Sequence, residues 1–241
     1  MENSIYIGLS KQVVLQRNMD IIANNVANMN TNGYRGQNMV FSEFISDPRG
    51  QDDPLSFVVD HGQYQITDPG SVRITENPLD VSLTGPGFLG IQAPDGEVAY
   101  SRDGHFQQGL DGALVSGSGL SVVDQGGSPI IIPSGTTEIN IDKKGVISNQ
   151  NGAIAQLMIV EFEDIQKLEQ LGNNLYRTDA TTLPAEKTTV AQGTLESSNV
   201  KPVIEMTRMI STLRSFQGVQ KILQTENERL RGAIQKLTQG G

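Results

Sequence analysis

The chain contains no cysteine and no tryptophan, and it has only two histidines among its 241 residues. Without cysteine, disulfide bonds, thiolate metal sites and cysteine nucleophiles are excluded. A zinc site or a Ser-His-Asp triad would have to use His61 or His105, and both are better explained as surface or turn residues. The composition therefore offers few of the side chains on which catalysis and metal binding usually depend.

Basic residues are also scarce. The chain has 18 Lys and Arg against 27 Asp and Glu, so its formal net charge is -9. A protein that binds DNA or RNA needs a basic surface to neutralise phosphates. We therefore expect no nucleic-acid partner.

Long apolar runs are missing as well. No uninterrupted apolar run exceeds four residues, and Leu157–Val160 is one of these. A membrane-spanning helix needs about 20 such residues, so we do not expect an integral membrane protein. The first residues lack the basic and apolar regions of a secretory signal peptide. If the chain leaves the cytoplasm, we expect export without a cleaved signal of this type.

The N-terminal part of the chain has a helical repeat from about Ile5 to Val26. Its apolar side chains recur at spacings of 4, 3, 4 and 3, which places them on one face of a helix. They are Leu15, Met19, Ile22, Val26 and Met29. The run from Asn28 to Gly33 is rich in residues that tolerate the left-handed conformation, so we expect the helix to end there.

The C-terminal part predicts a long helix from Pro202 to about Leu237. One row of side chains recurs every seven residues: Met209, Phe216, Leu223, Leu230 and Leu237. A second row consists of Met206, Leu213, Gln220, Asn227 and Ile234. Heptads of this length are typical of a coiled coil, in which the two polar residues of the second row would fix register. We therefore expect the N- and C-terminal α-helices to pair as a coiled coil.

Between the two helices the pattern is that of β-structure. Short apolar alternations from residue 79 to 190 are separated by Asp-Gly and Asn-Gly turns, which supply the positive φ that tight hairpins need. The fold class expected is mixed α and β, with a central mainly antiparallel β domain. We divide the chain into an N-terminal helical arm (1–35), an extended connecting segment (36–78), a β domain (79–190) and a C-terminal helical arm (191–241). Short strands are expected near Phe57–Val59 and Val72–Ile74.

Two patterns that could indicate chemistry have simpler explanations. Gly85–Gly90 matches the glycine fingerprint of dinucleotide-binding proteins, but no helix follows it and Pro86 lacks an N–H, so a tight bend between strands fits better. Four aspartates could suggest calcium, but each lies in a separate turn. They are Asp95, Asp103, Asp111 and Asp124. We expect no catalytic residue, no metal and no cofactor.

Four segments, taken in order, resemble the flagellar basal-body rod and hook protein family. They are Ala23–Asn28 with Asn30–Tyr34, Leu79–Val81 with Gly85–Phe88, Tyr100–Phe106, and Gly193–Val200. Together they extend over nearly the whole chain. The proline-containing segment Ser128–Pro133 resembles the proximal-rod type more than the distal-rod type.

The resemblance implies a structural subunit of the bacterial flagellar proximal rod. Such a subunit is exported by the flagellar type III apparatus without a cleaved signal peptide. It polymerises with other rod subunits and copies of itself into the axial tube that crosses the periplasm and transmits torque from motor to hook. The alternatives are a distal-rod subunit of the same family, and a secreted β-sandwich binding module with helical oligomerisation arms.

The expected assembly interface combines the helical rows with asparagines in and just after the last turn of the first helix, because asparagine is a poor choice for a helix interior. Its residues are Leu15, Met19, Ile22, Asn24, Asn25, Val26, Asn28, Met209, Leu213, Phe216, Gln220, Leu223, Asn227, Leu230, Ile234 and Leu237.

Overall fold

The computed structural model describes residues 2–46 and 55–239. The chain forms two compact units. Unit 1 comprises Met1–Ala27, Gln37–Tyr64 and Lys201–Gly241, and unit 2 comprises Asn28–Gly36 and Gln65–Val200. Both units are therefore built from segments that are distant in the sequence.

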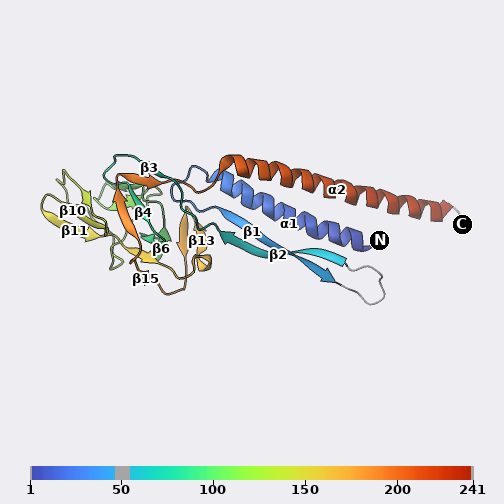
Figure 1. Cartoon of the computed structure of the whole chain (residues 1–241), viewed down its shortest axis with the longest axis horizontal. Helices are drawn as coiled ribbons and strands as arrows, with labels where there is room; N and C mark the ends of the chain where they lie inside the picture. The colour runs from blue at the N-terminus through green and yellow to red at the C-terminus, as the bar shows by residue number, and fades with distance from the viewer. Residues whose placement is uncertain (1, 47–54, 240–241) are drawn as a thin grey trace. The chain divides into compact units, whose positions relative to one another are not determined.

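Unit 1 is a pair of helices with a β-hairpin. Helix α1 (Glu2–Ala27) lies beside helix α2 (Pro202–Gln239), and strand β1 (Gln37–Ser46) pairs with β2 (Leu55–Gln65). Figure 1 shows α1 side by side with α2, which is longer and extends beyond the start of α1. The prediction that the terminal helices pair is thereby confirmed.

The two helices run in opposite directions. The Cβ that Gly8 lacks would lie 2.7 Å from the Leu223 side chain, near the start of α1. Further along α1, Asn18 Nδ2 donates to Thr212 Oγ1 at 3.4 Å. The contact partners on α2 move toward its N-terminus as those on α1 move toward its C-terminus, which defines an antiparallel pair.

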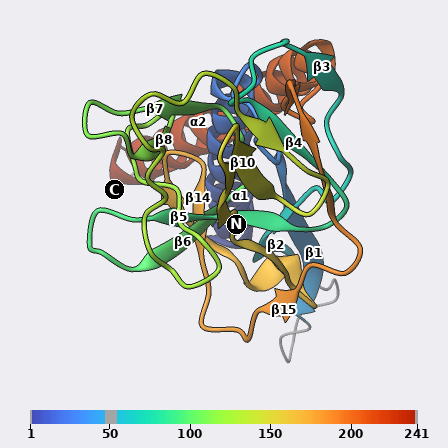
Figure 2. The same ribbon diagram turned by 90° about the vertical axis from the view of Figure 1, so that its left-hand side faces the viewer.

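Unit 2 is made of short antiparallel strands. Its largest sheet has six strands in the order β13 (Glu169–Gly172), β14 (Leu175–Arg177), β6 (Val98–Ser101), β5 (Phe88–Gln92), β12 (Ile159–Glu161) and β15 (Leu183–Pro184). Figure 2 shows β5, β6 and β14 next to one another. A three-stranded sheet consists of β11 (Gly152–Gln156), β10 (Val146–Asn149) and β9 (Asn140–Ile141).

Three two-stranded pairs complete the described strands of unit 2. They are β4 (Val81–Thr84) with β16 (Thr189–Gln192), β3 (Val72–Ile74) with β17 (Thr194–Glu196), and β7 (Phe106–Gln108) with β8 (Leu114–Ser116). A short 3-10 helix, η1 (Ile165–Lys167), precedes β13. These pairs are antiparallel, like those of the two larger sheets, which confirms the predicted fold class.

The core of unit 2 follows from the alternating pattern. The main cluster includes fully buried side chains such as Leu89, Ile91, Leu114 and Leu157. A second cluster is aromatic: the ring of Phe88 meets those of Phe162 and Tyr176 edge-on, at centroid distances of 5.5 and 5.7 Å. Edge-to-face pairs at this distance add to the stabilisation that comes from burial alone.

The aspartates that we assigned to turns do form turns. Asp95, Asp103 and Asp111 each accept a hydrogen bond through Oδ1 from the backbone N–H two residues later, at 3.0–3.1 Å. The glycines after Asp95 and Asp111 have φ of +88° and +81°, where a side chain would be strained. Turn formation therefore explains these acidic residues.

Between residues 36 and 78 the sequence predicted only part of the structure. Phe57–Val59 lies within β2, and Val72–Ile74 is β3, so both short strands are confirmed. Strand β1 was missed, because its polar and apolar residues do not alternate regularly. The boundaries that we predicted at residues 35/36, 78/79 and 190/191 divide the chain into parts that would fold independently. This division stays a prediction.

A buried amide joins three elements of unit 1. Asn25 is 1% exposed; its Oδ1 accepts from Gln37 N at 2.9 Å, and its Nδ2 donates to Gln37 O at 2.8 Å. Nδ2 also lies 3.2 Å from Glu205 Oε2, at the start of α2. One side chain thus holds the end of α1, the first residue of β1 and the first turn of α2.

We expect Asn25→Ala to lower the stability of unit 1 by about 2–4 kcal/mol, because buried polar groups on Gln37 and Glu205 would lose their partner. Urea unfolding followed by helical circular dichroism measures this loss. Gln16→Ala, at an exposed position of the same helix, is the matched control and should change stability little. Equal midpoints for both variants would show that the amide is dispensable.

Candidate functional site

The structure places the predicted interface residues of α1 on different sides of the helix. Ile22 and Asn25 are buried, whereas Leu15, Met19 and Val26 are half-buried and Asn24 is exposed. Asn28 lies beyond the helix, in unit 2, and is half-buried. The helical stripe that we predicted therefore lies on or beside the face that α2 covers.

The two predicted rows of α2 have different environments. The row of Met209, Phe216, Leu223 and Leu230 is half-buried, whereas Leu213, Gln220, Asn227 and Ile234 are exposed. Further covered positions include Glu205, Thr212, Val219 and Glu226. We did not predict them, because three of the four are polar. The side chain of Leu237 lies outside the described residues.

An exposed apolar stripe begins at the start of α2. Val203, Met206, Ile210 and Leu213 follow one another at spacings of 3, 4 and 3, and their exposures are 77, 46, 54 and 44%. The same spacing continues through polar residues, namely Gln217, Gln220, Gln224 and Asn227. The heptad repeat predicted a single seam on α2, which does not include Val203 and Ile210.

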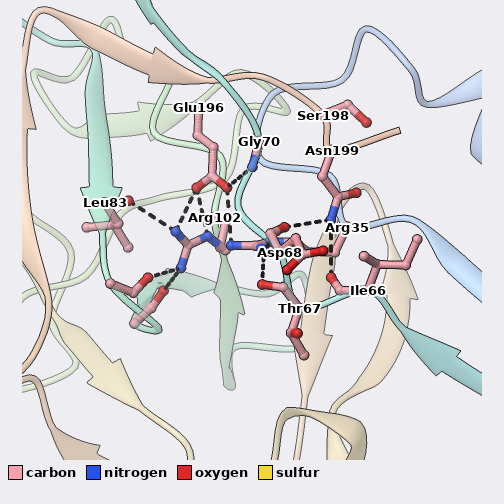
Figure 3. Close-up of polar contacts among 12 residues, drawn as sticks. Arg35, Ile66, Thr67, Asp68, Gly70, Leu83, Arg102, Glu196, Ser198 and Asn199 are labelled. Atoms are coloured by element: carbon pink, nitrogen blue, oxygen red, sulfur yellow. Dashed lines mark hydrogen bonds and ion pairs between the residues drawn. The ribbon is translucent and has the colours of Figure 1, made fainter. Parts of the chain in front are cut away.

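A cluster of buried charges occupies unit 2, and we refer to Arg35, Arg102 and Glu196 as the charge cluster (Figure 3). These residues are 5, 2 and 3% exposed. Arg35 Nη2 lies 3.1 Å from Glu196 Oε1, and Arg102 Nη2 lies 2.7 Å from Glu196 Oε2. One carboxylate therefore binds two guanidinium groups, and the cluster carries one net positive charge.

Arg102 uses all five of its N–H groups. Nε and Nη2 both donate to Glu196 Oε2, at 2.9 and 2.7 Å. The remaining donors bind backbone carbonyls: Leu83 O at 3.1 Å, Gly85 O at 3.0 Å and Gly87 O at 2.6 Å. The guanidinium carbon also lies 5.7 Å from the centre of the Phe88 ring. A fully paired guanidinium of this kind tolerates burial.

Arg35 connects the cluster to the segment that follows β2. Its Nη1 donates to Thr67 O at 2.6 Å and to Asp68 O. Burial lowers the pKa of the Arg35 guanidinium, and the nearby positive charge of Arg102 lowers it further, whereas Glu196 opposes both effects. Glu196 is therefore the counter-ion on which both arginines depend.

Backbone contacts reinforce the cluster. Glu196 Oε1 also accepts from Gly70 N at 3.0 Å, and Asn199 binds Gly36 N through Oδ1 and Asp68 O through Nδ2, at 2.7 and 2.8 Å. A Cβ on Gly70 would lie 1.8 Å from Ser197 O, so only glycine permits this approach. The segments before β1, after β2 and before α2 are thus fastened together within unit 2.

The four segments that carry the family resemblance meet at this cluster. Gly33, from the first segment, has a φ of +65°, and a Cβ there would lie 2.4 Å from Arg102 C. The second segment supplies the carbonyls of Gly85 and Gly87, the third supplies Arg102 and the fourth Glu196. We did not predict a role for the three charged residues; their position within glycine-rich segments was the only signal in the sequence.

The glycine fingerprint in the second segment forms a bend between β4 and β5, as expected. The carbonyls of Gly85 and Gly87 accept hydrogen bonds from the guanidinium group of Arg102. The backbone N–H of Gly87 donates to Thr188 Oγ1 at 2.9 Å. This arrangement differs from a phosphate site, in which backbone N–H groups converge on an anion.

His105 belongs to a smaller polar group. Its Nδ1 lies 2.8 Å from Asp80 Oδ1, and its backbone N–H donates to Asp103. Burial raises the pKa of the Asp103 carboxyl group, against the opposing effect of its hydrogen bonds. His61 lies in β2, and its side chain lies outside the described residues.

Two further findings concern the described part of the chain alone. No group of three histidine or acidic side chains there is arranged to hold a metal ion. Neither helix is apolar enough over a sufficient length to cross a bilayer.

Three family models match consecutive parts of the chain. They are described as flagella basal body rod protein (residues 5–35), flagellar hook protein FlgE/F/G D1 domain (82–149) and flagellar basal body rod FlgEFG protein C-terminal (191–236).

Curated relatives match over almost the full length. The flagellar basal-body rod protein FlgF of Caulobacter vibrioides is 35% identical over 242 residues, covering 98% of each chain. FlgG of Buchnera aphidicola from Acyrthosiphon pisum is 34% identical over 264 residues, also covering 98% of each. FlgF of Mesorhizobium japonicum is 32% identical over 226 residues, covering 92% of each.

We expect Asp103→Asn to stabilise unit 2 at neutral pH. A carboxyl group whose pKa is raised by folding favours the folded state below its ordinary value, 3.8, and this contribution is lost as pH rises through the raised value. An amide keeps the acceptor for His105 N without the buried charge. The midpoint of thermal unfolding should therefore rise by a few degrees at pH 7, and the gain should vanish below pH 3.8.

The matched control is Asp111→Asn, which replaces an exposed aspartate that makes the same hydrogen bond in its turn. An equal gain in both variants, or a gain for Asp103→Asn that persists in acid, would contradict the role of burial.

Proposed function

We propose that this chain, which belongs to the flagellar basal-body rod protein family, is the FlgF-type subunit of the proximal rod. As a member of this family it is a structural rod subunit that assembles with other rod subunits, and it is not an enzyme. The alignment lengths support the FlgF type. The same 98% of this chain needs 264 aligned positions for a FlgG relative but only 242 for a FlgF relative, so the FlgF alignment has far fewer gaps.

The exposed apolar stripe of α2 supports a contact with a neighbouring subunit. Apolar side chains at heptad spacing are left in water within the single chain, although the other face of α2 is covered by α1. A second helix would bury them in the same way. We include Val203, Met206, Ile210 and Leu213 in the proposed assembly interface, together with the residues that the sequence predicted.

The polar continuation of this stripe has a separate role in the proposal. Gln220, Asn227 and Gln12 line one open hollow of about 430 Å³ in unit 1. Amides in a helical interface contribute less to affinity than apolar side chains, but they restrict the partner to one register. Register matters in a helical tube, because it determines where each subunit lies relative to the next.

The location and the export route are part of the same proposal. The rod would cross the periplasm, and the chain would reach it through the flagellar type III apparatus without losing a signal peptide. The printed names of the FlgF and FlgG relatives, both basal-body rod proteins, support this location.

A distal-rod subunit is the second candidate, because FlgG of Buchnera aphidicola is nearly as similar as FlgF of Caulobacter vibrioides. Gold labelling of a tagged chain in isolated basal bodies separates the two. We expect label at the motor-proximal end of the rod. Label at the hook-proximal end would favour the distal type, and basal bodies without label would overturn the assignment to the rod.

A pair of substitutions on α2 tests the interface. Leu213 is exposed, so Leu213→Asp should leave the monomer folded and abolish its incorporation into basal bodies. Leu223 packs against Gly8, so Leu223→Asp should cost the helix pair roughly 2–4 kcal/mol through the charge placed in the seam. Circular dichroism measures folding, and immunoblots of purified basal bodies measure incorporation. Normal motility with Leu213→Asp would exclude the stripe as an interface.

A further inference from the structure

We propose that Glu196 gates the folding of unit 2, so that the unit stays open until the segment just before α2 is bound. The proposal concerns the order of folding. Its purpose in the cell rests on the proposed export of this subunit.

The contacts of Glu196 are distant in the sequence. Its carboxylate binds Arg102 and Gly70 N, which precede it by 94 and 126 residues. Its backbone carbonyl accepts from Gly33 N at 2.8 Å, and the next residue, Ser197, donates to Ser71 O at 2.8 Å. Every one of these bonds must wait until almost the whole of unit 2 is present.

Without Glu196, the same site holds two cations and no counter-ion. Arg35 and Arg102 are both buried and already repel one another. Backbone carbonyls orient the guanidinium of Arg102, but they do not neutralise it. Burial of an unpaired charge is strongly unfavourable, so the segment containing Gly33 and Arg35 cannot close over Arg102 before Glu196 arrives.

The backbone pairing leads to the same conclusion. Among the described strands, β3 pairs with β17 alone, in the register Ile74 with Thr194, Arg73 with Leu195 and Val72 with Glu196. Strand β3 therefore has no ladder until β17 is in place. Leu195, 3% exposed, adds an apolar side chain that is buried in the same step.

The local hairpins of unit 2 do not need Glu196 or β17 in order to form. Strands β10 and β11 are joined by a tight turn and pair antiparallel, with one shift of register between Ile147 and Ser148. We expect such hairpins to form early, whereas the junction of residues 28–36, 65–74 and 193–200 forms last. A subunit that must pass through an export channel before it folds would keep this junction open.

Folding kinetics of the full chain test the gate. Glu196→Gln keeps the shape and removes the charge. If Glu196 binds in the transition state, refolding should slow by about a hundred-fold while unfolding changes by less than about three-fold. The signal is the intrinsic fluorescence and near-UV circular dichroism of tyrosine, since Tyr34, Tyr100 and Tyr176 all lie in unit 2.

Ile147→Val, in β10, is the control for a local contact that forms early, and we expect it to slow refolding by less than about ten-fold and to leave unfolding nearly unchanged. Glu196→Asp, which keeps the charge on a shorter side chain, provides a milder variant if Glu196→Gln does not fold. Refolding of either Glu196 variant at the wild-type rate, with all of the loss appearing in faster unfolding, would overturn the gate.

A secretion assay separates the gate from the proposed function. Cells that express the full chain with Glu196→Gln should export it through the flagellar apparatus at least as well as the wild-type chain, because an open unit 2 does not hinder passage. Reduced export would overturn the link between the gate and passage, although the kinetic result would stand. If the wild-type chain is not exported by this apparatus, the proposed function fails instead.

Discussion

A single carboxylate between two buried guanidinium groups is the interaction on which unit 2 depends. Buried ion pairs are seldom a large source of net stability, because desolvation offsets most of the attraction, but removal of one partner costs about 3–5 kcal/mol. Glu196 is shared by Arg35 and Arg102, so its loss leaves two charges unpaired. The value of the cluster is geometric: only one arrangement of the glycine bend, β17 and the segment after β2 satisfies all of its donors.

Unit 1 uses polar groups in a related way. Asn18 pairs with Thr212, and Asn25, seven residues later in α1, pairs with Glu205, seven residues earlier in α2. An entirely apolar seam would tolerate a shift of one helix against the other, because one leucine packs as well as the next. Buried amides and a carboxylate tolerate only the register that pairs them. Arg208, which lies 2.9 Å from Glu205 and 3.1 Å from Asn38, extends this restriction to the first residues of β1.

The sequence predicted the features that depend on local patterns. Both long helices and the aspartate turns were recovered, because helical periodicity and turn chemistry act over a few residues. The charge cluster was not recovered, since its members come together only through pairing across 94 or more residues. Resemblance to a family identified the segments involved but not the bonds that join them. Strand β1 was missed for a similar reason. Its polar and apolar residues do not alternate regularly, and it forms a strand through pairing with β2.

The heptad pattern of α2 did not separate the side chains that α1 covers from those that remain exposed. A row of apolar residues every seven positions identifies a contact, but it does not say which helix makes it. Met209 and Phe216 are partly covered by α1, whereas Met206, Ile210 and Leu213 remain in water. Exposed apolar side chains in a row favour association, and the net charge of -9 opposes association between free subunits. The two helices therefore pair within one chain, but α2 still exposes apolar side chains to water. These side chains lie in the N-terminal half of α2, so burial against a neighbouring helix would stabilise that half most.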